Sequence, residues 1–488
     1  MNPTIIQIIK QLKRNYLRRL KFEIAFYACQ FHYATCLPLN RPRCQNQSAP
    51  IFFNEHTSSK AEGKVIKIFA FSFKSAYFRA KIRPTYFMKF ALLKERKNPP
   101  DRRVVMSPQK LAEARDLFPQ ASFVVESSDI RIFPDEAYAS LGFEVTHDVR
   151  DCDVLIGVKE VPIDQLIPNK KYFYFSHTIK KQPYNRTLLK AMLDKNIEMF
   201  DHETIVKKSG ARLIGFGRYA GLVGTYNGLR ALGMRDQLFD LPKVETLADL
   251  NAMKAELDGI TIPNIKILLS GTGKVALGAK EILDHLNIKE VSDALYLTSQ
   301  FHEPVYCMVD VMEYNKRTDG KVGDKWAFYK DPSGYESNFM PYAKETDMFV
   351  AGHFYGNGAP YLFTREDAKH PEFRINLVAD ISCDVDGPVA STLRASTIAD
   401  PFYGYDPITE SEVPFNSNNA ITVMAVDNLP CELPKDASEG FGDMFVEHVL
   451  PAFFNNDERG ILKRAKITAN GKLTERYSYL QDYVDGKE

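Results

Sequence analysis

A buried strand, a glycine turn and a helix follow one another without interruption in residues 265–286, "IKILLSGTGKVALGAKEILDHL". The apolar run leads directly into Gly271 and Gly273 of a G-x-G-x-x-A motif, and an amphipathic helical pattern begins at once after it. In this setting the glycines permit a tight turn, and backbone N–H groups at the start of the helix can meet a pyrophosphate. The segment therefore predicts an α/β domain that binds a dinucleotide.

A second match to the same motif, "GFGRYA" with Gly215 and Gly217, follows only a short apolar run, so we prefer an interdomain turn to a phosphate contact there. Neither segment has the Gly-Lys-Ser/Thr ending of a P-loop, which disfavours ATP chemistry. Asp293 has the spacing of a ribose-binding acid, but no clean strand ends there, so the motif does not separate NAD from NADP.

Strand-like and helical patterns alternate from residue 88 to about 205 and again from about 225, and the chain is richer in turns after about 390. Such alternation is typical of parallel sheets. We predict an α/β fold of two Rossmann-like, doubly wound domains with an active-site cleft between them. The expected parts are a catalytic and substrate domain (88–224, completed by about 395–488) and an NAD(P)-binding domain (225–394).

The first 87 residues differ in kind, with 15 Lys and Arg against 3 Asp and Glu, whereas the rest has 48 against 59. No run there approaches the roughly 18–20 apolar residues of a transmembrane helix. The segment has three interpretations: a mitochondrial transit peptide, a basic membrane-surface or nucleic-acid arm, or upstream sequence outside the working protein. We favour the last.

The seven cysteines form no C-x-x-C pair, so we expect neither a disulfide framework nor a zinc site. A reducing, cytoplasmic location is the default expectation, with the mitochondrial matrix as the alternative if residues 1–87 are a transit segment. We further expect small-molecule substrates, no metal, no nucleic-acid or membrane partner, and a monomer or small homo-oligomer.

Two neighbouring strand patterns end in groups that can carry protons. "DVLIGVK" ends in Lys159 and "KYFYFSH" in His177. Because parallel strands place ligand-facing residues at their carboxyl ends, both side chains could enter one cleft. Partial burial lowers the pKa of a lysine and histidine titrates near neutrality, so the pair suits proton transfer. The alternative is a solvated strand end and a hydrogen-bonded turn residue.

Asp384 follows a further strand pattern, in "LVADISCD". It could face a nicotinamide or pair with a cation such as Lys180. Equally, it could cap the turn before Gly387.

Several longer motifs carry a family resemblance: "GVKEVP", "FSHTIKKQ", "GFGRYAGLVG", "GTGKVALGA", "DISCD", "STIADPF" and "VDNLPCELPKDASEGFGDM". Over about residues 88–485 the chain resembles the saccharopine dehydrogenase family. The closest likeness is to the lysine-ketoglutarate reductase half of aminoadipic semialdehyde synthase, and alanine dehydrogenase is more distant.

The resemblance implies an NAD- or NADP-dependent oxidoreductase that condenses L-lysine with 2-oxoglutarate to saccharopine, or runs the reverse reaction. It assigns acid–base roles to Lys159 and His177. The other residues that it implies bind either substrate (Lys94, Arg96, Glu160, Lys180, Gln182, Glu203, Arg212 and Phe216) or cofactor (Gly271, Thr272, Gly273, Lys274, Ser382 and Asp384).

The chain departs from the family near its start, where relatives carry an arginine in "RxE" or "RRE" and this chain has "LLKERK". Lys94 or Arg96 would then have to bind a substrate carboxylate. Two alternatives to the main hypothesis are an alanine-dehydrogenase-like amino-acid dehydrogenase and a non-catalytic dinucleotide-binding sensor.

Overall fold

The computed structural model describes residues 87–356 and 358–487. Our expectations for the basic N-terminal segment, including its transit function, therefore fall outside the described residues, which take in only its last residue, Phe87. Within the described residues, no helix is both long and apolar enough to cross a membrane.

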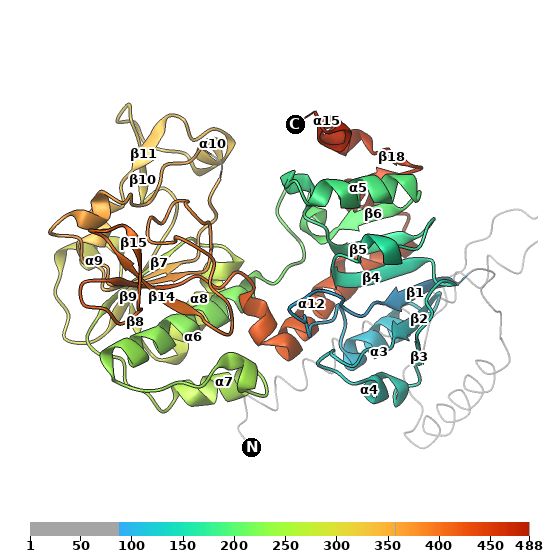
Figure 1. Cartoon of the computed structure of the whole chain (residues 1–488), viewed down its shortest axis with the longest axis horizontal. Helices are drawn as coiled ribbons and strands as arrows, with labels where there is room; N and C mark the ends of the chain where they lie inside the picture. Colours follow the sequence, from blue (N-terminus) through green and yellow to red (C-terminus); the bar gives the residue numbers. More distant parts are fainter. Residues whose placement is uncertain (1–86, 357, 488) are drawn as a thin grey trace, which may run out of the picture. The chain divides into compact units, whose positions relative to one another are not determined.

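The first sheet has six parallel strands in the order β3-β2-β1-β4-β5-β6. This is a doubly wound order, with its switch point between β1 and β4, where ligands bind in such sheets. Figure 1 shows the strands with their helices. The elements are β1 (Met88–Leu92), β2 (Ala121–Glu126), β3 (Glu144–Thr146), β4 (Val154–Lys159), β5 (Lys171–Phe175), β6 (Glu198–Asp201), α3 (Pro108–Leu117), α4 (Asp135–Ala139) and α5 (Asn185–Asp194).

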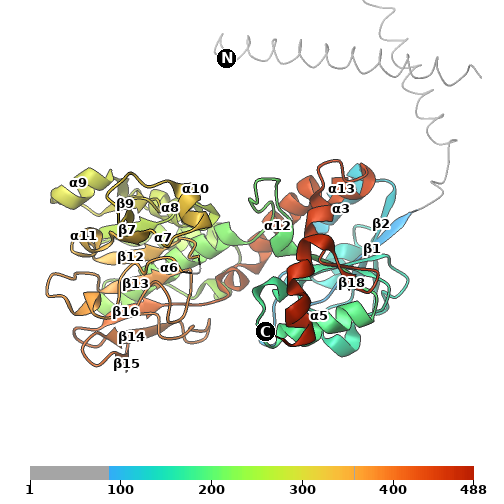
Figure 2. The same cartoon turned by 90° about the horizontal axis from the view of Figure 1, so that it is seen from above.

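The second sheet has eight strands in the order β15-β14-β16-β13-β12-β7-β9-β8, and Figure 2 shows most of them in succession. Seven of its strands run in the same direction, and β14 is reversed, pairing antiparallel with both β15 and β16. The strands are β7 (Lys266–Ser270), β8 (Lys289–Glu290), β9 (Val305–Val309), β12 (Met348–Ala351), β13 (Leu377–Asp380), β14 (Phe402–Asp406), β15 (Ser411–Val413) and β16 (Ile421–Met424).

The helices of this part are α6 (Gly217–Asp236), α7 (Leu250–Leu257), α8 (Lys274–His285), α9 (Asp293–Thr298) and α11 (Met340–Ala343). A separate excursion consists of β10 (Asn315–Arg317), α10 (Lys325–Lys330) and β11 (Tyr335–Ser337), in which β10 pairs with β11. The predicted α/β class with parallel sheets is confirmed, while the cleft between two domains stays a prediction.

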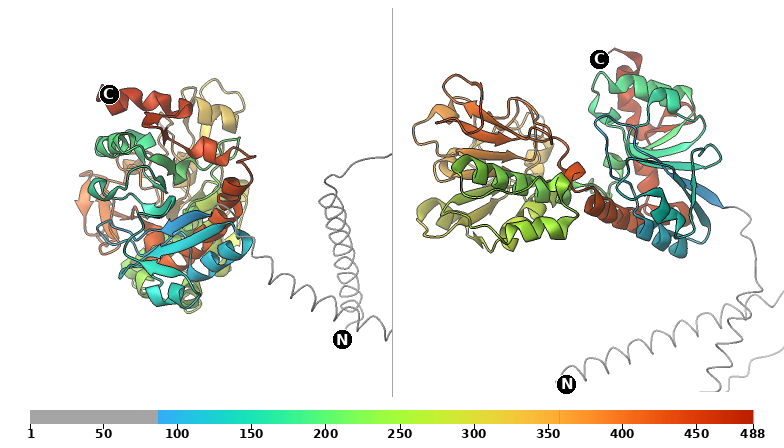
Figure 3. Two further views of the ribbon diagram at one scale, coloured as in Figure 1. Left: turned by 90° about the vertical axis from the view of Figure 1, so that its right-hand side faces the viewer. Right: turned by 60° about the horizontal axis from the view of Figure 1, so that its bottom comes forward.

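The chain returns to the first sheet later than the expected residue 395, because β14 and β16 pair in the second sheet. The sequence did not reveal strands β14, β15 and β16, because they are short and joined by turns, and the expected boundary was therefore too early. The return begins with α12 (Pro434–His448), whose Phe441 and Phe445 share a core with Phe90 and Phe173. In Figure 3 these C-terminal elements, in red, lie beside the blue and green strands and helices of the first sheet. The rest are α13 (Leu450–Phe454), α14 (Ile461–Ala465), β17 (Thr468–Ala469), β18 (Lys472–Leu473) and α15 (Gln481–Asp485).

Helices α6 and α8 touch along their backbones because glycines remove the side chains between them. A Cβ atom at Gly221 would lie 2.0 Å from the Val275 oxygen, and one at Gly278 would lie 2.1 Å from the Arg218 oxygen. The second glycine motif is therefore the start of a packed helix, and not only the turn that we expected.

Candidate active site

A cavity of about 820 Å³ lies where strands of both sheets reach their carboxyl ends. It brings together residues that are more than 100 positions apart in the sequence. The sequence-predicted residues that line it are Lys159, His177, Glu203, Arg212, Phe216, Gly271, Thr272, Gly273 and Lys274.

Lys159 is the last residue of β4, after the fully buried run Val154–Val158. Two hydrogen bonds fix this strand end, since the N–H groups of Val158 and Lys159 donate to the carboxylate of Glu95 at 2.7 and 2.8 Å. Burial, reinforced by the charge of Arg103, lowers the pKa of Lys159. At a given pH, a larger fraction of Lys159 is therefore neutral, and able to accept a proton, than of a solvated lysine.

His177 follows β5 in a left-handed conformation, with φ of 55°. The buried Asp201 stabilises this turn, because one of its oxygens accepts hydrogen bonds from the N–H groups of Ser176 and His177 at 3.0 and 3.1 Å. Its other oxygen accepts from the N–H of Glu203 at 2.7 Å. Asp201 thus sets the backbone of two predicted site residues.

Glu203 lies between three side chains that can carry a positive charge: His177, Lys180 and Arg212. Its carboxylate lies 3.1 Å from Nδ1 of His177, 2.9 Å from Arg212 and 3.7 Å from Lys180. Burial alone would raise the pKa of Glu203, but the His177 hydrogen bond and the two cations outweigh it and bring the pKa to about 2. An ionised carboxylate only accepts hydrogen bonds, so Nδ1 of His177 carries the proton and Nε2 remains for a substrate.

Because its folded-state pKa is depressed, Glu203 contributes stability above pH 4.5 that is lost as the pH falls towards 2. We expect Glu203→Gln to lower the free energy of unfolding by on the order of 3 kcal/mol near neutrality, and by progressively less in acid. Urea unfolding of both proteins across this range measures the difference. The exposed Glu475→Gln is the control, and a Glu203→Gln deficit that does not change with pH would contradict the assignment.

Arg103 is a cavity-lining cation that the sequence did not reveal. It is buried, lines the cavity and lies 4.3 Å above the Phe216 ring. Asp101 holds it through two bonds of 3.0 and 2.6 Å, and this leaves Nη1 without a contact to Asp101. A guanidinium fixed in this way suits a bidentate bond to a carboxylate.

Lys94 and Arg96, expected in that role, do not line the cavity. The Arg96 guanidinium instead pairs with Glu126 and donates to Gln165 at 2.6 Å. The cation that lines the cavity from this part of the chain is thus Arg103 of the later "DRR" segment, and the substrate role of Lys94 and Arg96 stays a prediction.

Three other predicted substrate residues lie outside the lining. Glu160 pairs with Lys97 at 3.1 Å, while its second oxygen is buried without a hydrogen-bond partner among the described residues. Lys180 is about half exposed and reaches Glu203. Gln182 is exposed, and its backbone oxygen accepts from Tyr483 at 2.5 Å.

The glycine turn has the shape required for a pyrophosphate. Gly271 has φ of +90°, and a Cβ there would lie 2.8 Å from the Gly352 oxygen, so β7 and β12 meet closely at the switch point of the second sheet. Gly273 caps α8 and has open space around its missing side chain. The buried His353 lines the same cavity, and its Nε2 is buried without a hydrogen-bond partner among the described residues. These features fit a bound dinucleotide.

Ser382 and Asp384 lie after β13 and outside the cavity lining. The buried Asp380 organises this loop, accepting from the Ser382 hydroxyl at 2.6 Å and from the Thr392 hydroxyl at 2.6 Å. Burial, with Asp380 nearby, raises the pKa of Asp384 to about 6, while Lys180 lowers it. The charge of Lys180 thus acts on Asp384, while the pairing of the two side chains stays a prediction, and the Ser382 hydroxyl has a structural contact to Asp380.

Asp293, the spacing-based candidate for the ribose, begins α9 and ends no strand. Asp310 instead follows β9, the strand beside β7, and its carboxylate accepts from Thr272 at 3.3 Å. The element pair β8–α9 separates it from the glycine turn, so the usual spacing did not reveal it. Its position at a strand end was the available signal.

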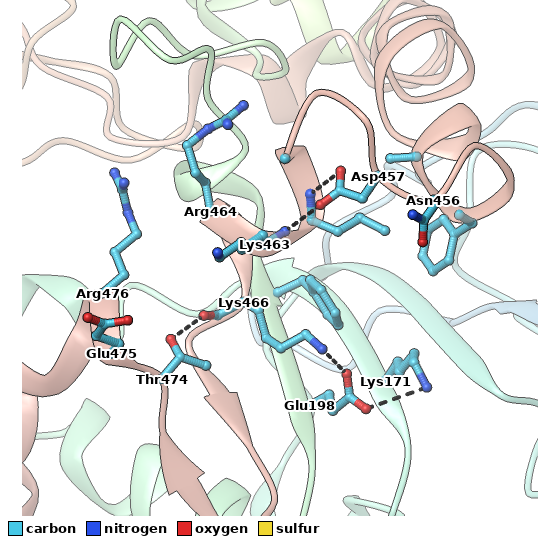
Figure 4. A pocket seen from close by; sticks show the side chains of 15 residues that line it. Lys171, Glu198, Asn456, Asp457, Lys463, Arg464, Lys466, Thr474, Glu475 and Arg476 are labelled. Carbon is cyan, nitrogen blue, oxygen red and sulfur yellow. Dashed lines mark hydrogen bonds and ion pairs between the residues drawn. The ribbon is translucent and has the colours of Figure 1, made fainter.

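Another cavity, of about 680 Å³, lies at the amino ends of β5 and β6 (Figure 4). Its Glu198 pairs with Lys466 at 2.5 Å and lies 3.6 Å from Lys171. None of the predicted acid–base or cofactor residues lines it. The candidate site is therefore the cavity at the carboxyl ends.

Residues 91–223 match the family model "Alanine dehydrogenase/PNT, N-terminal domain". The chain is 29% identical over 437 residues to alpha-aminoadipic semialdehyde synthase of Arabidopsis thaliana, covering 80% of this chain and 41% of that protein. The mouse protein, named alpha-aminoadipic semialdehyde synthase, mitochondrial, is also 29% identical, over 82% of this chain and 48% of its own length. The chain thus spans less than half the length of these two relatives.

A saccharopine dehydrogenase [NAD(+), L-lysine-forming] of Emericella nidulans is 22% identical, over 72% of this chain and 88% of its own length. The fold agrees with a solved L-alanine dehydrogenase, with a TM-score of 0.54 at 15% identity, covering 82% of this chain and all of that one. The resemblance deduced from the motifs is confirmed, since the chain is similar in sequence to aminoadipic semialdehyde synthases and saccharopine dehydrogenases, and its residues 91–223 match the alanine dehydrogenase/PNT N-terminal domain model.

Proposed function

We propose that the chain is an NAD(P)-dependent oxidoreductase of lysine metabolism that joins L-lysine and 2-oxoglutarate into saccharopine, or runs the reverse reaction. The observation that carries the proposal is the single cavity that contains Lys159, His177 and the glycine turn. The names of the aminoadipic semialdehyde synthases and of the saccharopine dehydrogenase support the substrate class.

The proposed roles follow from the contacts of each group. Neutral Lys159 takes a proton from the substrate ammonium, so that the amine can attack the ketone, and it returns a proton to the hydroxyl that leaves as water. His177, oriented by Glu203, exchanges a proton with the secondary amine through Nε2. Arg103 and Arg212 bind substrate carboxylates, and Glu203 and Glu160 attract the ammonium.

The turn of Gly271, Thr272 and Gly273, together with Lys274, would hold the dinucleotide, which supplies or accepts the hydride. The ammonium of Lys274 donates to the Leu213 oxygen at 3.2 Å, so it already bridges from α8 to the segment that carries Arg212. Asp384, placed after β13, would lie beside the nicotinamide. The proposed domains are the first sheet with its helices and the C-terminal return, and the second sheet with its helices, so that α6, which packs against α8, lies in the second domain and not across the expected boundary at 224.

The full chain should oxidise NADH or NADPH only when lysine and 2-oxoglutarate are both present, as measured by absorbance of the reduced cofactor. Single-substrate reactions are the controls. Oxidation with pyruvate and ammonia instead would favour an alanine-dehydrogenase-like enzyme. Dinucleotide binding without turnover on any of these substrates would favour the non-catalytic sensor.

The mitochondrial designation of the mouse and rat relatives supports the mitochondrial over the cytoplasmic alternative. The N-terminal mass of the native protein would show whether residues 1–87 are removed.

A further inference from the structure

The excursion β10–α10–β11 brings a cation to the dinucleotide end of the cavity. Lys325 and Tyr329 of α10 line the cavity wall. Phe328, between them in sequence, is buried in a core with Tyr314 and Tyr335. This anchor fixes α10 on the sheet, so the position of Lys325 is set by the fold and not by a free surface loop.

Lys325 is bonded to the acid beside the glycine turn. Its ammonium donates to both oxygens of Asp310, at 2.7 and 2.5 Å, and to the Thr272 hydroxyl at 3.3 Å. Thr272 stands between the two glycines of the turn. The pair therefore lies directly next to the position expected for the pyrophosphate.

Asp310 has the location from which an acid accepts hydrogen bonds from the adenosine ribose, at the end of the strand beside β7. Its Oδ1 already accepts from Val311 N–H, Thr272 and Lys325. Among the residues that the structure describes, its Oδ2 accepts from Lys325 alone. A carboxylate oxygen has two lone pairs, so Oδ2 retains capacity for a ribose hydroxyl.

A bare carboxylate at this place would repel a 2′-phosphate, which carries up to about two negative charges near neutrality. Lys325 cancels that charge and has three donors of its own. Resting on the proposed function, we propose that this pair determines dinucleotide choice: Asp310 binds the ribose hydroxyls of NAD(H), and Lys325, keeping a bond to Asp310, donates to the 2′-phosphate of NADP(H), so that the chain accepts both.

The neighbouring cations of the excursion have other contacts. Arg317 and Lys321 pair with Asp319, and Lys316 pairs with Glu336. Among the described residues 310–337, Lys325 is the cation that lines the cavity. The discrimination therefore depends on one lysine and one aspartate, which can be changed separately.

The test is titration of the full-length chain with NADH and with NADPH, following the fluorescence of the reduced nicotinamide. Lys325→Met should weaken NADPH about tenfold or more, the scale of one charge-assisted hydrogen bond, and leave NADH unchanged or tighter. Asp310→Asn keeps the bond from Val311 and should have the opposite effect, weakening NADH relative to NADPH. The ratio of the NADPH to the NADH dissociation constant should therefore rise in Lys325→Met and fall in Asp310→Asn.

Lys321→Met, a highly exposed lysine of the same excursion, is the matched control and should leave both dissociation constants unchanged. Equal losses for both dinucleotides in Lys325→Met, or no change, would overturn the inference while leaving the proposed function intact. A wild-type chain that binds neither dinucleotide would instead refute the proposed function.

Discussion

Lys159→Met should lower turnover about 10²–10⁴-fold, the usual contribution of a positioned acid–base group, while dinucleotide affinity stays unchanged. The side chain enters the cavity from the last residue of β4, and Glu95 holds the backbone there through its N–H groups. The substitution therefore removes the amine without releasing the strand. Stopped-flow turnover and fluorescence titration of NADH and NADPH separate the two effects.

Lys171→Met is the matched control, because Lys171 lies at the opposite, amino end of the neighbouring strand β5. It should keep wild-type turnover. Burial and Arg103 lower the pKa of Lys159. Turnover that needs the neutral amine should therefore increase with pH, with a midpoint below the ordinary lysine value of 10.5. Wild-type turnover in Lys159→Met would remove this residue from the mechanism.

The strand ends were predictable because a short, continuous stretch of sequence identifies each of them. The buried run before Lys159 and the aromatic run before His177 identify two neighbouring parallel strands, and such strands end at the same edge. The glycine turn was predictable for the same reason, since a strand, two glycines and a helix are contiguous in the chain.

The groups that orient these side chains were not predictable, because their partners are distant in sequence. Glu95 bonds to backbone 63 and 64 residues later, and Asp201 bonds to Ser176 and His177 from the next strand. In the sequence "PPDRRVV", nothing distinguishes Arg103 from a surface arginine. Only the structure shows that it is buried together with Asp101. Asp310 was missed because β8 and α9 lengthen the usual spacing.

The same methyl group added at the two glycines of the turn should have two different effects. At Gly271, φ of +90° and the 2.8 Å approach of the Gly352 oxygen leave no room for a Cβ. Gly271→Ala should therefore lower the free energy of unfolding by about 2 kcal/mol or more, from backbone strain and overpacking together. Urea unfolding measures this loss.

At Gly273 the backbone is extended and no atom lies within 4 Å of an added Cβ, so Gly273→Ala should cost under about 1 kcal/mol, the scale of a changed helix cap. The space that it fills is the space proposed for the pyrophosphate. Separating the phosphate from the N–H groups of α8 should weaken NADH and NADPH alike, by roughly tenfold to a hundredfold. Unchanged affinity for both dinucleotides in a stable Gly273→Ala protein would mean that the pyrophosphate does not bind at this turn.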